Sequence, residues 1–392
     1  MGSVEKPRGG AASPPATVCH VTTVHVPFDT RIFHKECRSL ADAGYDVHLV
    51  ACHDRDEVVD GIRVHALPRP PGRRARVLLW PWLACAKVLS LRPAPSLVHF
   101  HDPELLPASQ SLRLCGLKAI YDVHENVAGD LAAKPYLPRW LRLPVAMIYR
   151  AIEAVLGIGM PTLHVLEDIA GQYRQPRSVV RNLPWAADAP VRPDRPVGRP
   201  AKLVYLGVVS TDRGAGTMID LAGELNCRAL DFELRIIGPI HEPGLAEALA
   251  GAIVDHGLAD RVFVLGRMPY AMARAALAEA DLGLCLLQPT TNYRRSLPTK
   301  VLDYMAAGLP VVATDIPGWR TYVTEPGSGL QVDPADTAGA ADCVESILKD
   351  PARFRAMSRR GRAAVESTFC WEIEQQKLLA FYDRLLASRI TP

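Results

Sequence analysis

The sequence predicts an α/β protein built from two doubly wound domains with parallel sheets. Short apolar windows of strand character alternate with helical windows along most of the 392 residues, and this alternation is typical of βα units. The pattern breaks at 184–200, where five prolines stand in seventeen residues, a composition typical of a linker. The chain is also too long for one typical domain. We therefore predict an N-terminal domain at 17–183 and a C-terminal domain at 201–369.

The N-terminal domain is expected to contain seven strands with helices between them. Gly44 should end the first helix, because glycine readily adopts the left-handed conformation that closes a helix. The expected strands are 18–24, 46–51, 62–67, 97–101, 119–124, 162–165 and 178–180, and the expected helices are 30–43, 77–89, 104–114 and 140–156.

The C-terminal domain repeats the alternation, and 296–315 is its most informative stretch. Ser296 can cap a helix, Pro298 suits a first helical turn, Gly308 stops the helix and an apolar strand follows. The expected strands of this domain are 203–206, 234–237, 262–265, 282–286, 311–313 and 330–332.

Composition excludes several classes of protein. The net charge is only +3, so bulk electrostatics predict no nucleic-acid or membrane binding. The nine cysteines are scattered, without a Cys-x-x-Cys pair, which favours free thiols in a reducing compartment and a cytoplasmic protein. Residues 1–16 lack an apolar core and are interpreted as a disordered tail. We expect no transmembrane segment, because the apolar run at 77–86 is too short to span a bilayer.

An anion site is predicted where the helix of 296–315 begins. This helix follows the apolar run 281–288, so its free N–H groups should lie at the carboxyl end of a parallel strand. Lys300 adds a charge, Asp303 lies one turn further on, and the loop 206–214 brings Arg213 to the same region. The set suits a nucleoside diphosphate, with the cations on phosphate and the carboxylate on ribose. The alternative is an ordinary αβ unit with a surface lysine and arginine.

Other nucleotide sites lack their fingerprints, because neither Gly-x-Gly-x-x-Gly after the first strand nor a P-loop motif occurs. We expect no bound cofactor. Polar side chains also gather at the strand ends of the N-terminal domain and would suit a polyhydroxylated ligand; the alternative is that each is a satisfied structural residue. They are His25, Asp29, Arg31, His34, Glu36, His99, His101, Asp102, Glu104, His124 and Glu125.

Two short patterns were weighed as metal sites. His99-Phe-His101 could form half of one, because alternate strand residues share a face. No second closely spaced histidine pair accompanies it, so we expect no metal. Asp54-Arg-Asp56 matches Asp-x-Asp, but a pattern this short is interpreted as solvated loop charge.

A basic stretch with aromatic residues runs from 73 to 92 and contains Trp80 and Trp82. Such a helix can lie on an anionic membrane, which would suit a lipid acceptor. Pro81 interrupts the helix, and a packed domain helix with basic flanks is the alternative that we favour.

Several long motifs, in order along the chain, resemble family 4 of the retaining glycosyltransferases, which have the two-domain GT-B fold. The resemblance covers nearly the whole chain. It rests on Asp29-Thr-Arg-Ile-Phe-His-Lys-Glu36 with Leu40-Ala-Asp-Ala-Gly-Tyr45, on His99-Phe-His-Asp-Pro-Glu104, on Tyr121-Asp-Val-His124, on the segment from Pro298 to Asp315, and on the terminal helix from Phe369 to Leu386.

The resemblance implies a nucleotide-sugar donor on the C-terminal domain, an acceptor on the N-terminal domain, a terminal helix (370–388) that crosses back, no metal and a retained anomeric configuration. Independently of the resemblance, two doubly wound domains joined by a proline-rich hinge are expected to place their strand ends face to face, with the ligand site in the cleft between them. Arg295 and Val208 stand where the family has a glutamate and a first phosphate-binding arginine.

We therefore predict a metal-independent transferase that moves a hexose-type sugar, with UDP favoured over GDP or dTDP as the nucleotide of the donor. Alternatives are a nucleotide-sugar epimerase or hydrolase of the same fold, and an inactive sugar-binding protein. The predicted site residues are His124, Arg213 and Lys300 for catalysis; Gly207, Arg213, Gly238, Ser296, Leu297, Pro298, Thr299, Lys300 and Asp303 for the donor; and Asp29, Arg31, His34, His101, Asp102 and Glu104 for the acceptor.

Overall fold

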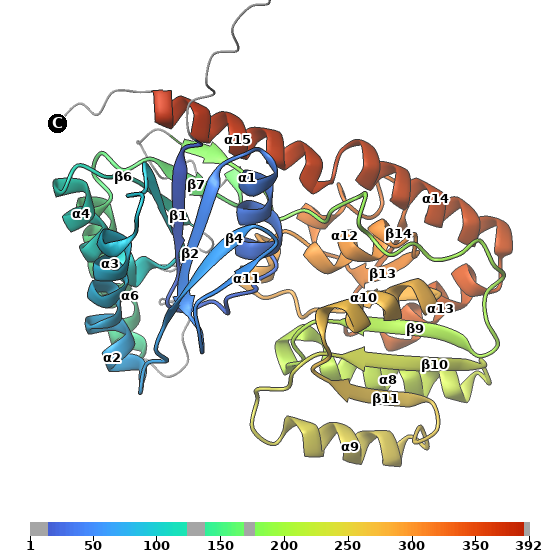
Figure 1. The fold of residues 1–392 in the computed structure, drawn as a ribbon. Helices are drawn as coiled ribbons and strands as arrows, with labels where there is room; N and C mark the ends of the chain where they lie inside the picture. The colour runs from blue at the N-terminus through green and yellow to red at the C-terminus, as the bar shows by residue number, and fades with distance from the viewer. Residues whose placement is uncertain (1–14, 124–137, 168–176, 388–392) are drawn as a thin grey trace, which may run out of the picture. The chain divides into compact units, whose positions relative to one another are not determined.

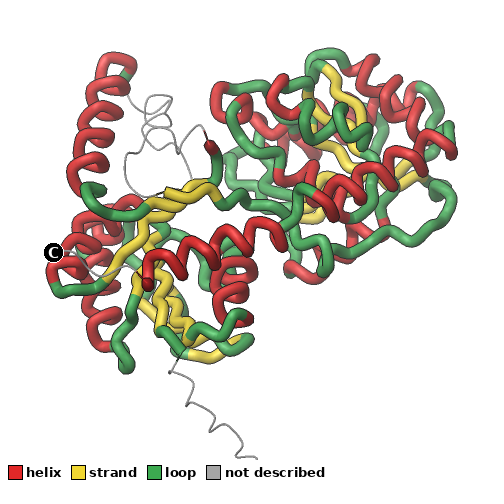
Figure 2. Tube along the Cα trace, turned by 90° about the horizontal axis from the view of Figure 1, so that it is seen from above, coloured by secondary structure: helices red, strands yellow, loops and turns green. Residues whose placement is uncertain are grey.

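The computed structural model describes residues 15–123, 138–167 and 177–387. The chain divides into two compact units, 1–181 with 375–392, and 182–374. Each unit has one sheet with helices on both sides (Figures 1 and 2). The last helix, α15 (Trp371–Ala387), begins in the second unit and ends in the first. Nearly all of the predicted tail lies outside the described residues.

The first unit contains an eight-stranded sheet of order β3-β4-β2-β1-β5-β6-β7-β8. Its strands are parallel, as predicted, except that β3 pairs antiparallel with β4. The strands are β1 (Thr17–Val21), β2 (Asp46–Cys52), β3 (Glu57–Val59), β4 (Ile62–Leu67), β5 (Leu97–Phe100), β6 (Lys118–Val123), β7 (Thr162–His164) and β8 (Arg177–Val179).

The helices of this unit confirm the predicted windows, with changes at their ends. Gly44 has a φ of 91° and follows the first helical segment, as expected. The window 77–89 divides into two helices at Leu79, because Pro81 opens a new helix there. The helical elements are η1 (Ile32–Cys37), α1 (Arg38–Asp42), α2 (Arg73–Leu78), α3 (Trp80–Ser90), η2 (Pro103–Leu105), α4 (Leu106–Leu114) and α6 (Arg139–Leu156).

Strand β3 was not predicted. It pairs with β4 through a two-residue turn at Asp60 and Gly61, both with positive φ. An Asp-Gly pair is a strong signal for such a hairpin, so the sequence did contain the information that would have identified it.

The two faces of the first sheet differ in chemistry. Cys19, Val21, Val98 and Phe100 join the apolar core that includes side chains of α3 and α4. Because side chains alternate along a strand, the histidines between them lie on the opposite face. Helices α2, α3, α4 and α6 gather on one side of this sheet and α1 lies on the other (Figure 1).

The second unit contains a six-stranded parallel sheet of order β11-β10-β9-β12-β13-β14. All six strands confirm predicted windows, and separate apolar cores pack on the sheet. The strands are β9 (Ala201–Leu206), β10 (Phe232–Ile237), β11 (Val262–Gly266), β12 (Leu282–Cys285), β13 (Val311–Thr314) and β14 (Gly329–Val332). The helical elements are η3 (Thr211–Arg213), α8 (Ala215–Cys227), α9 (Leu245–Asp255), α10 (Tyr270–Glu279), α11 (Thr291–Arg294), α12 (Thr299–Ala306), η4 (Pro317–Trp319), α13 (Thr337–Leu348) and α14 (Pro351–Ser367).

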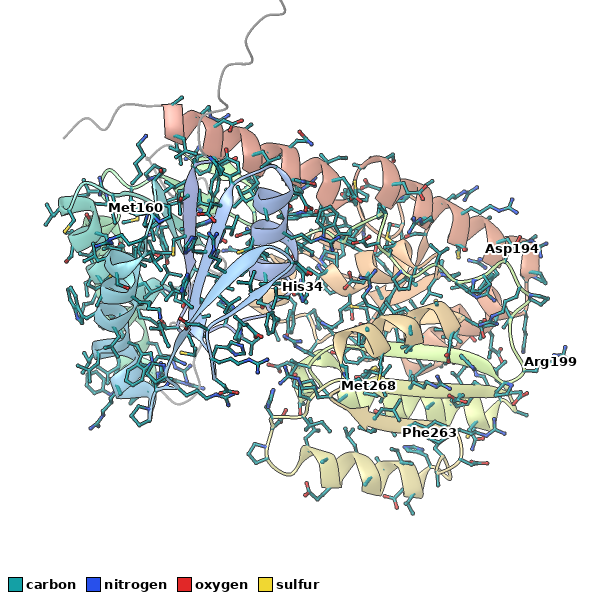
Figure 3. The ribbon with its side chains drawn as sticks, in the orientation of Figure 1. His34, Met160, Asp194, Arg199, Phe263 and Met268 are labelled. Atoms are coloured by element: carbon teal, nitrogen blue, oxygen red, sulfur yellow. The ribbon has the colours of Figure 1, made fainter. Side chains whose placement is uncertain are left out.

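The proline-rich segment 184–200 contains no helix or strand. It packs on the second unit, where the buried Arg192 guanidinium lies 2.8 Å from the Asp281 carboxylate. The backbone N–H of Arg192 also donates to the carbonyl of Ala307. Asp194 and Arg199 mark this segment in Figure 3. In the described parts of the chain, every helix is too short or too polar to cross a bilayer.

Candidate functional site

Helix α12 begins and ends close to the predicted positions. Gly308 follows it with a φ of 73° and closes it, as expected. Two details of its start were wrong. Pro298 is the residue before the first turn, and Ser296 lies too early to cap, so its hydroxyl donates to the carbonyl of Tyr293. The indole N–H of Trp319 holds this loop by donating to the carbonyl of Ser296, 3.0 Å away.

Tyr304 fixes α12 on the sheet. Its hydroxyl accepts the backbone N–H of Leu206 (3.0 Å) and donates to the carbonyl of Leu284 (3.2 Å). The ring lies over Gly283, where a Cβ would come within 2.3 Å of it. The helix is therefore tied to β9 and to β12, one turn after Lys300. No sequence motif singled out Tyr304, because its partners belong to strands elsewhere in the chain.

Lys300 extends from the first turn of α12 beside the end of β9. Its ammonium lies 5.7 Å from the centre of the Tyr205 ring, within cation–π range. Burial lowers the pKa of Lys300, and the positive charge of Arg213 lowers that pKa further, whereas the Asp303 carboxylate acts in the opposite sense. Asp303 is half-buried one turn further along the helix. The structure thus brings together the three charged residues of the predicted donor site.

Arg213 is the last residue of η3, and its Nε–H donates to the hydroxyl of Tyr293 (3.3 Å). Gly214 follows with a φ of 76°, and a Cβ there would lie 1.9 Å from the carbonyl oxygen of Leu286. Among the described residues, neither Arg213 nor Lys300 forms an ion pair with a carboxylate. Two neighbouring cations that form no ion pair therefore lie near the start of α12, and an external anion suits them.

Gly207 and Gly238 allow the backbone to pass closely at this point. A Cβ on Gly207 would lie 2.5 Å from Cε of Lys300, and a Cβ on Gly238 would lie 1.8 Å from the carbonyl oxygen of Gly207. Their φ angles of 142° and 150° also disfavour any other residue. Gly207 therefore leaves room for the lysine side chain, and Gly238 leaves room for the backbone of Gly207.

The remaining donor residues lie around the start of α12. Leu297 packs against the apolar core, and the N–H of Thr299 donates to the Leu297 carbonyl (2.9 Å). Arg295 is exposed, and Val208 is half-buried. The family resemblance implies a glutamate at the position of Arg295 and an arginine at that of Val208. Neither Arg295 nor Val208 has the chemistry of the residue it stands for.

Replacing Gly207 by alanine should weaken nucleotide binding by roughly tenfold or more, because the new methyl group would displace the lysine side chain. Calorimetric titration with UDP measures this change. Gly251→Ala is the matched control, since a Cβ at this glycine of α9 meets nothing within 4 Å. Equal affinity of the two variants would contradict the placement of Lys300 in the site.

The predicted acceptor residues are placed in the first unit, where two of them organise the loop after β1. The Asp29 carboxylate accepts the backbone N–H groups of Arg31 (2.8 Å) and Ile32 (3.0 Å). The Asp102 carboxylate accepts the hydroxyl of Thr22 (2.9 Å). Both carboxylates therefore support the backbone from which the other polar groups extend.

Arg31 and His101 point into the first unit. The Arg31 guanidinium lies 2.9 Å from the Glu36 carboxylate and 3.4 Å from that of Asp122. The His101 ring contacts Asp122 (3.3 Å) and His20 (2.9 Å). Both side chains are almost fully buried and contact polar groups of the same unit. These contacts fit the alternative of structural residues, and contact with the acceptor stays a prediction.

Three further candidates complete the list. His34, labelled in Figure 3, is half-buried on η1. Glu104 pairs with Arg76 (3.1 Å), and burial raises its pKa. His25, which is not among the predicted acceptor residues, lies 3.8 Å from Asp29 and 3.5 Å from Asp102. These carboxylates outweigh burial and raise the pKa of His25. His124 lies outside the described residues.

Similar solved structures define the class of fold. Sucrose-phosphate synthase from Thermosynechococcus elongatus has a TM-score of 0.76 at 17% identity, covering 95% of this chain and 100% of that one. Anabaena HepE, solved with UDP and glucose, has a TM-score of 0.70 at 14% identity, covering 94% and 100%. The protein therefore has the predicted GT-B fold.

Sequence comparison identifies the type of enzyme. Residues 30–184 match the model described as Glycosyltransferase Family 4, and residues 200–350 match the model of Glycosyl transferases group 1. Glycogen synthase of Mycobacterium tuberculosis H37Rv is 24% identical over 87% of both chains. The chain is a glycosyltransferase of the family 4 and group 1 type, as its motifs suggested.

Proposed function

We propose that the protein is a retaining, metal-independent glycosyltransferase that moves a hexose-type sugar from a nucleoside-diphosphate sugar to an acceptor hydroxyl. The observation that carries this proposal is the pair of neighbouring cations, Arg213 and Lys300, which form no ion pair with a carboxylate of the described residues. A diphosphate would supply the negative charge that these cations lack, and we assign Asp303 to the ribose hydroxyls. UDP is the favoured nucleotide, and HepE, which has the same fold, was solved with UDP.

The mechanism that we propose is substitution on one face of the sugar. The bond between the anomeric carbon and the β-phosphate oxygen breaks as the acceptor oxygen approaches from the same face. The acceptor proton passes to the departing diphosphate, so no protein base is required. Arg213, Lys300 and the N–H groups of α12 stabilise the charge that develops on this leaving group. We assign His124 to the surroundings of the donor sugar.

Titration of the purified protein with UDP, GDP and dTDP in buffer containing EDTA tests this proposal. We expect one nucleotide, UDP, to bind with micromolar affinity, and the Lys300→Ala variant to lose most of that affinity. Binding of none of the three, or binding that requires Mg²⁺ or Mn²⁺, would refute the metal-free donor site. Product analysis with and without acceptors then separates transfer from hydrolysis or epimerisation.

We further propose that the acceptor is carried on an anionic membrane, to which the first unit binds peripherally through 73–92 and α6. Helix α6 is amphipathic, yet Ala146 is its one buried residue among those described. Within these two segments Glu153 is the single acidic residue, while many arginines are exposed. The large exposed apolar residues are Val77, Leu78, Leu79, Trp82, Leu83, Leu89, Trp140, Leu143, Met147, Ile148, Ile152 and Val155.

Replacing Leu143 and Ile152 together by aspartate should lower binding to vesicles by roughly tenfold or more, because each apolar side chain that enters the interface contributes to partitioning. Co-sedimentation with vesicles containing phosphatidylglycerol measures this binding. Leu114→Asp is the control, since Leu114 is 90% exposed at the end of α4, outside both segments. Binding that is unchanged in the double variant, or absent in the wild type, would refute the membrane contact.

A further inference from the structure

Four buried polar side chains converge on one face of the first sheet. They are His20 of β1, Glu36 of η1, and His99 and His101 at the end of β5, and each has an exposed fraction of 2% or less. One ligand atom of each lies within 4.8 Å of every other. The register of β1 and β5 sets His20 beside His99, and the alternation along β5 puts His101 on the same face.

Glu36 lies at the centre of this group. Its Oε2 atom is 3.9 Å from Nδ1 of His20, 3.9 Å from Nε2 of His101 and 4.0 Å from Nδ1 of His99. Ligand atoms around a tetrahedral zinc ion lie about 3.4 Å from one another, since each is about 2.1 Å from the metal. The observed spacing therefore needs only small side-chain shifts to hold such an ion.

Two buried carboxylates lie against one guanidinium in this group, because Glu36 and Asp122 both contact Arg31. The Nδ1 atom of His99 lies 2.7 Å from the hydroxyl of Tyr382, and its Nε2 atom has no hydrogen-bond partner among the described residues. A buried carboxylate calls for a cation or a proton.

Outer partners orient the ligands in the way that metal sites require. With Nε2 of His101 as the ligand atom, its Nδ1–H donates to Asp122 (3.3 Å). With Nδ1 of His20 as the ligand atom, its Nε2–H donates to the hydroxyl of Tyr382 (3.1 Å). Arg31 holds the second oxygen of Glu36 (2.9 Å). Three of the four candidate ligands are thus fixed by neighbours.

We propose that His20, Glu36, His99 and His101 bind one divalent transition-metal cation, Zn²⁺, which ties η1 to β1 and β5. Three imidazoles and one carboxylate form a ligand set that suits this ion. The site is structural and distinct from the donor site, so it is independent of the proposed transfer reaction. The competing arrangement has no metal: Glu36 carries a proton, and hydrogen bonds run from Asp122 through His101, His20 and Tyr382 to His99.

Metal analysis of the full chain, prepared without a histidine tag from cells supplied with zinc, tests the site. We expect about one zinc per chain in the wild type and loss of that zinc in Glu36→Gln and in His99→Gln. His48→Gln is the matched control, because His48 and His65 form a similar pair (2.8 Å) on β2 and β4 without a central glutamate. Wild-type protein without bound metal, which also fails to bind added Zn²⁺ or Co²⁺, would overturn the proposal.

Stability separates the two arrangements independently. If the cation is present, removing it with dipicolinate should lower the Tm of the wild type by about 5 °C or more, and Glu36→Gln should behave like the chelated protein. If Glu36 is protonated instead, glutamine reproduces the neutral carboxyl group, and the variant should keep the wild-type Tm. If the variant fails to fold, Co²⁺ is added to the chelated wild type and its visible absorption is measured. Tetrahedral coordination by nitrogen and oxygen gives an intense band. The absence of this band would overturn the site.

Discussion

Replacing Lys300 by alanine should lower kcat/KM for sugar transfer by roughly 10²-fold or more, the usual loss when one preorganised charge-stabilising contact is removed. The lysine side chain has a fixed route past Gly207 to the Tyr205 ring, so its ammonium needs no reorganisation as charge grows on the leaving diphosphate. Because Arg213 lies in the same site, Arg213→Ala should cause a loss of similar size. Transfer assays with saturating and limiting donor measure both effects.

Lys202→Ala provides the control for this prediction. Lys202 lies at the amino end of β9, the opposite end from the site, where it pairs with Glu279. Its removal should leave transfer unchanged. Wild-type turnover in Lys300→Ala or in Arg213→Ala would show that these cations do not act on the diphosphate, and the donor site would then lie elsewhere.

The same site should respond to alkaline pH. Burial lowers the pKa of Lys300 in the free protein, and under the proposed function a diphosphate would bind the protonated form. Affinity for UDP should therefore be full at neutral pH and weaken as pH rises through this lowered pKa, earlier than an exposed lysine would allow. Titrations at increasing pH measure this, and the Lys300→Ala variant should show no such dependence.

The meeting of the three charged residues could be predicted because the parts of this region are local. Lys300 and Asp303 share one helix, and Arg213 follows β9, which is the direct neighbour of β12 in the sheet. Carboxyl ends of adjacent parallel strands lie together, so their meeting followed from the order of elements. The prediction that Ser296 caps the helix was wrong, because the loop before α12 is two residues longer than the pattern indicated.

The buried histidine cluster could not be predicted in the same way. His99 and His101 were recognised as sharing a face, but their partner His20 comes from a strand about 80 residues earlier in the chain. Alternation along each strand shows which of its own side chains share a face, but it does not show which distant strand lies beside them. Glu36 joins them only through the packing of η1. Register between distant strands is tertiary information, which one sequence does not display.

Replacing Arg31 by alanine should destabilise the first unit by about 3–5 kcal/mol, because it leaves Glu36 and Asp122 buried without their shared counter-charge. Urea unfolding followed by circular dichroism measures this free energy. His34→Ala is the control, since His34 is half-buried on the same helical segment and should cost little. A variant of Arg31 that keeps wild-type stability but loses activity would contradict this structural role and would favour the prediction that this arginine contacts the acceptor.

The cost of losing Arg31 should also depend on metal. A divalent cation held by Glu36 and the three histidines would supply positive charge to the same two carboxylates, so Arg31→Ala should cost less in zinc-loaded protein than in chelated protein. The free energy of unfolding is measured for the wild type and for Arg31→Ala, each with zinc and after chelation. This double-mutant-type cycle gives the coupling free energy between the arginine and the cation, and it shows whether both stabilise the same two carboxylates. Equal costs with and without zinc would show that the two positive charges act on the cluster independently, and the charge argument for the metal would fail.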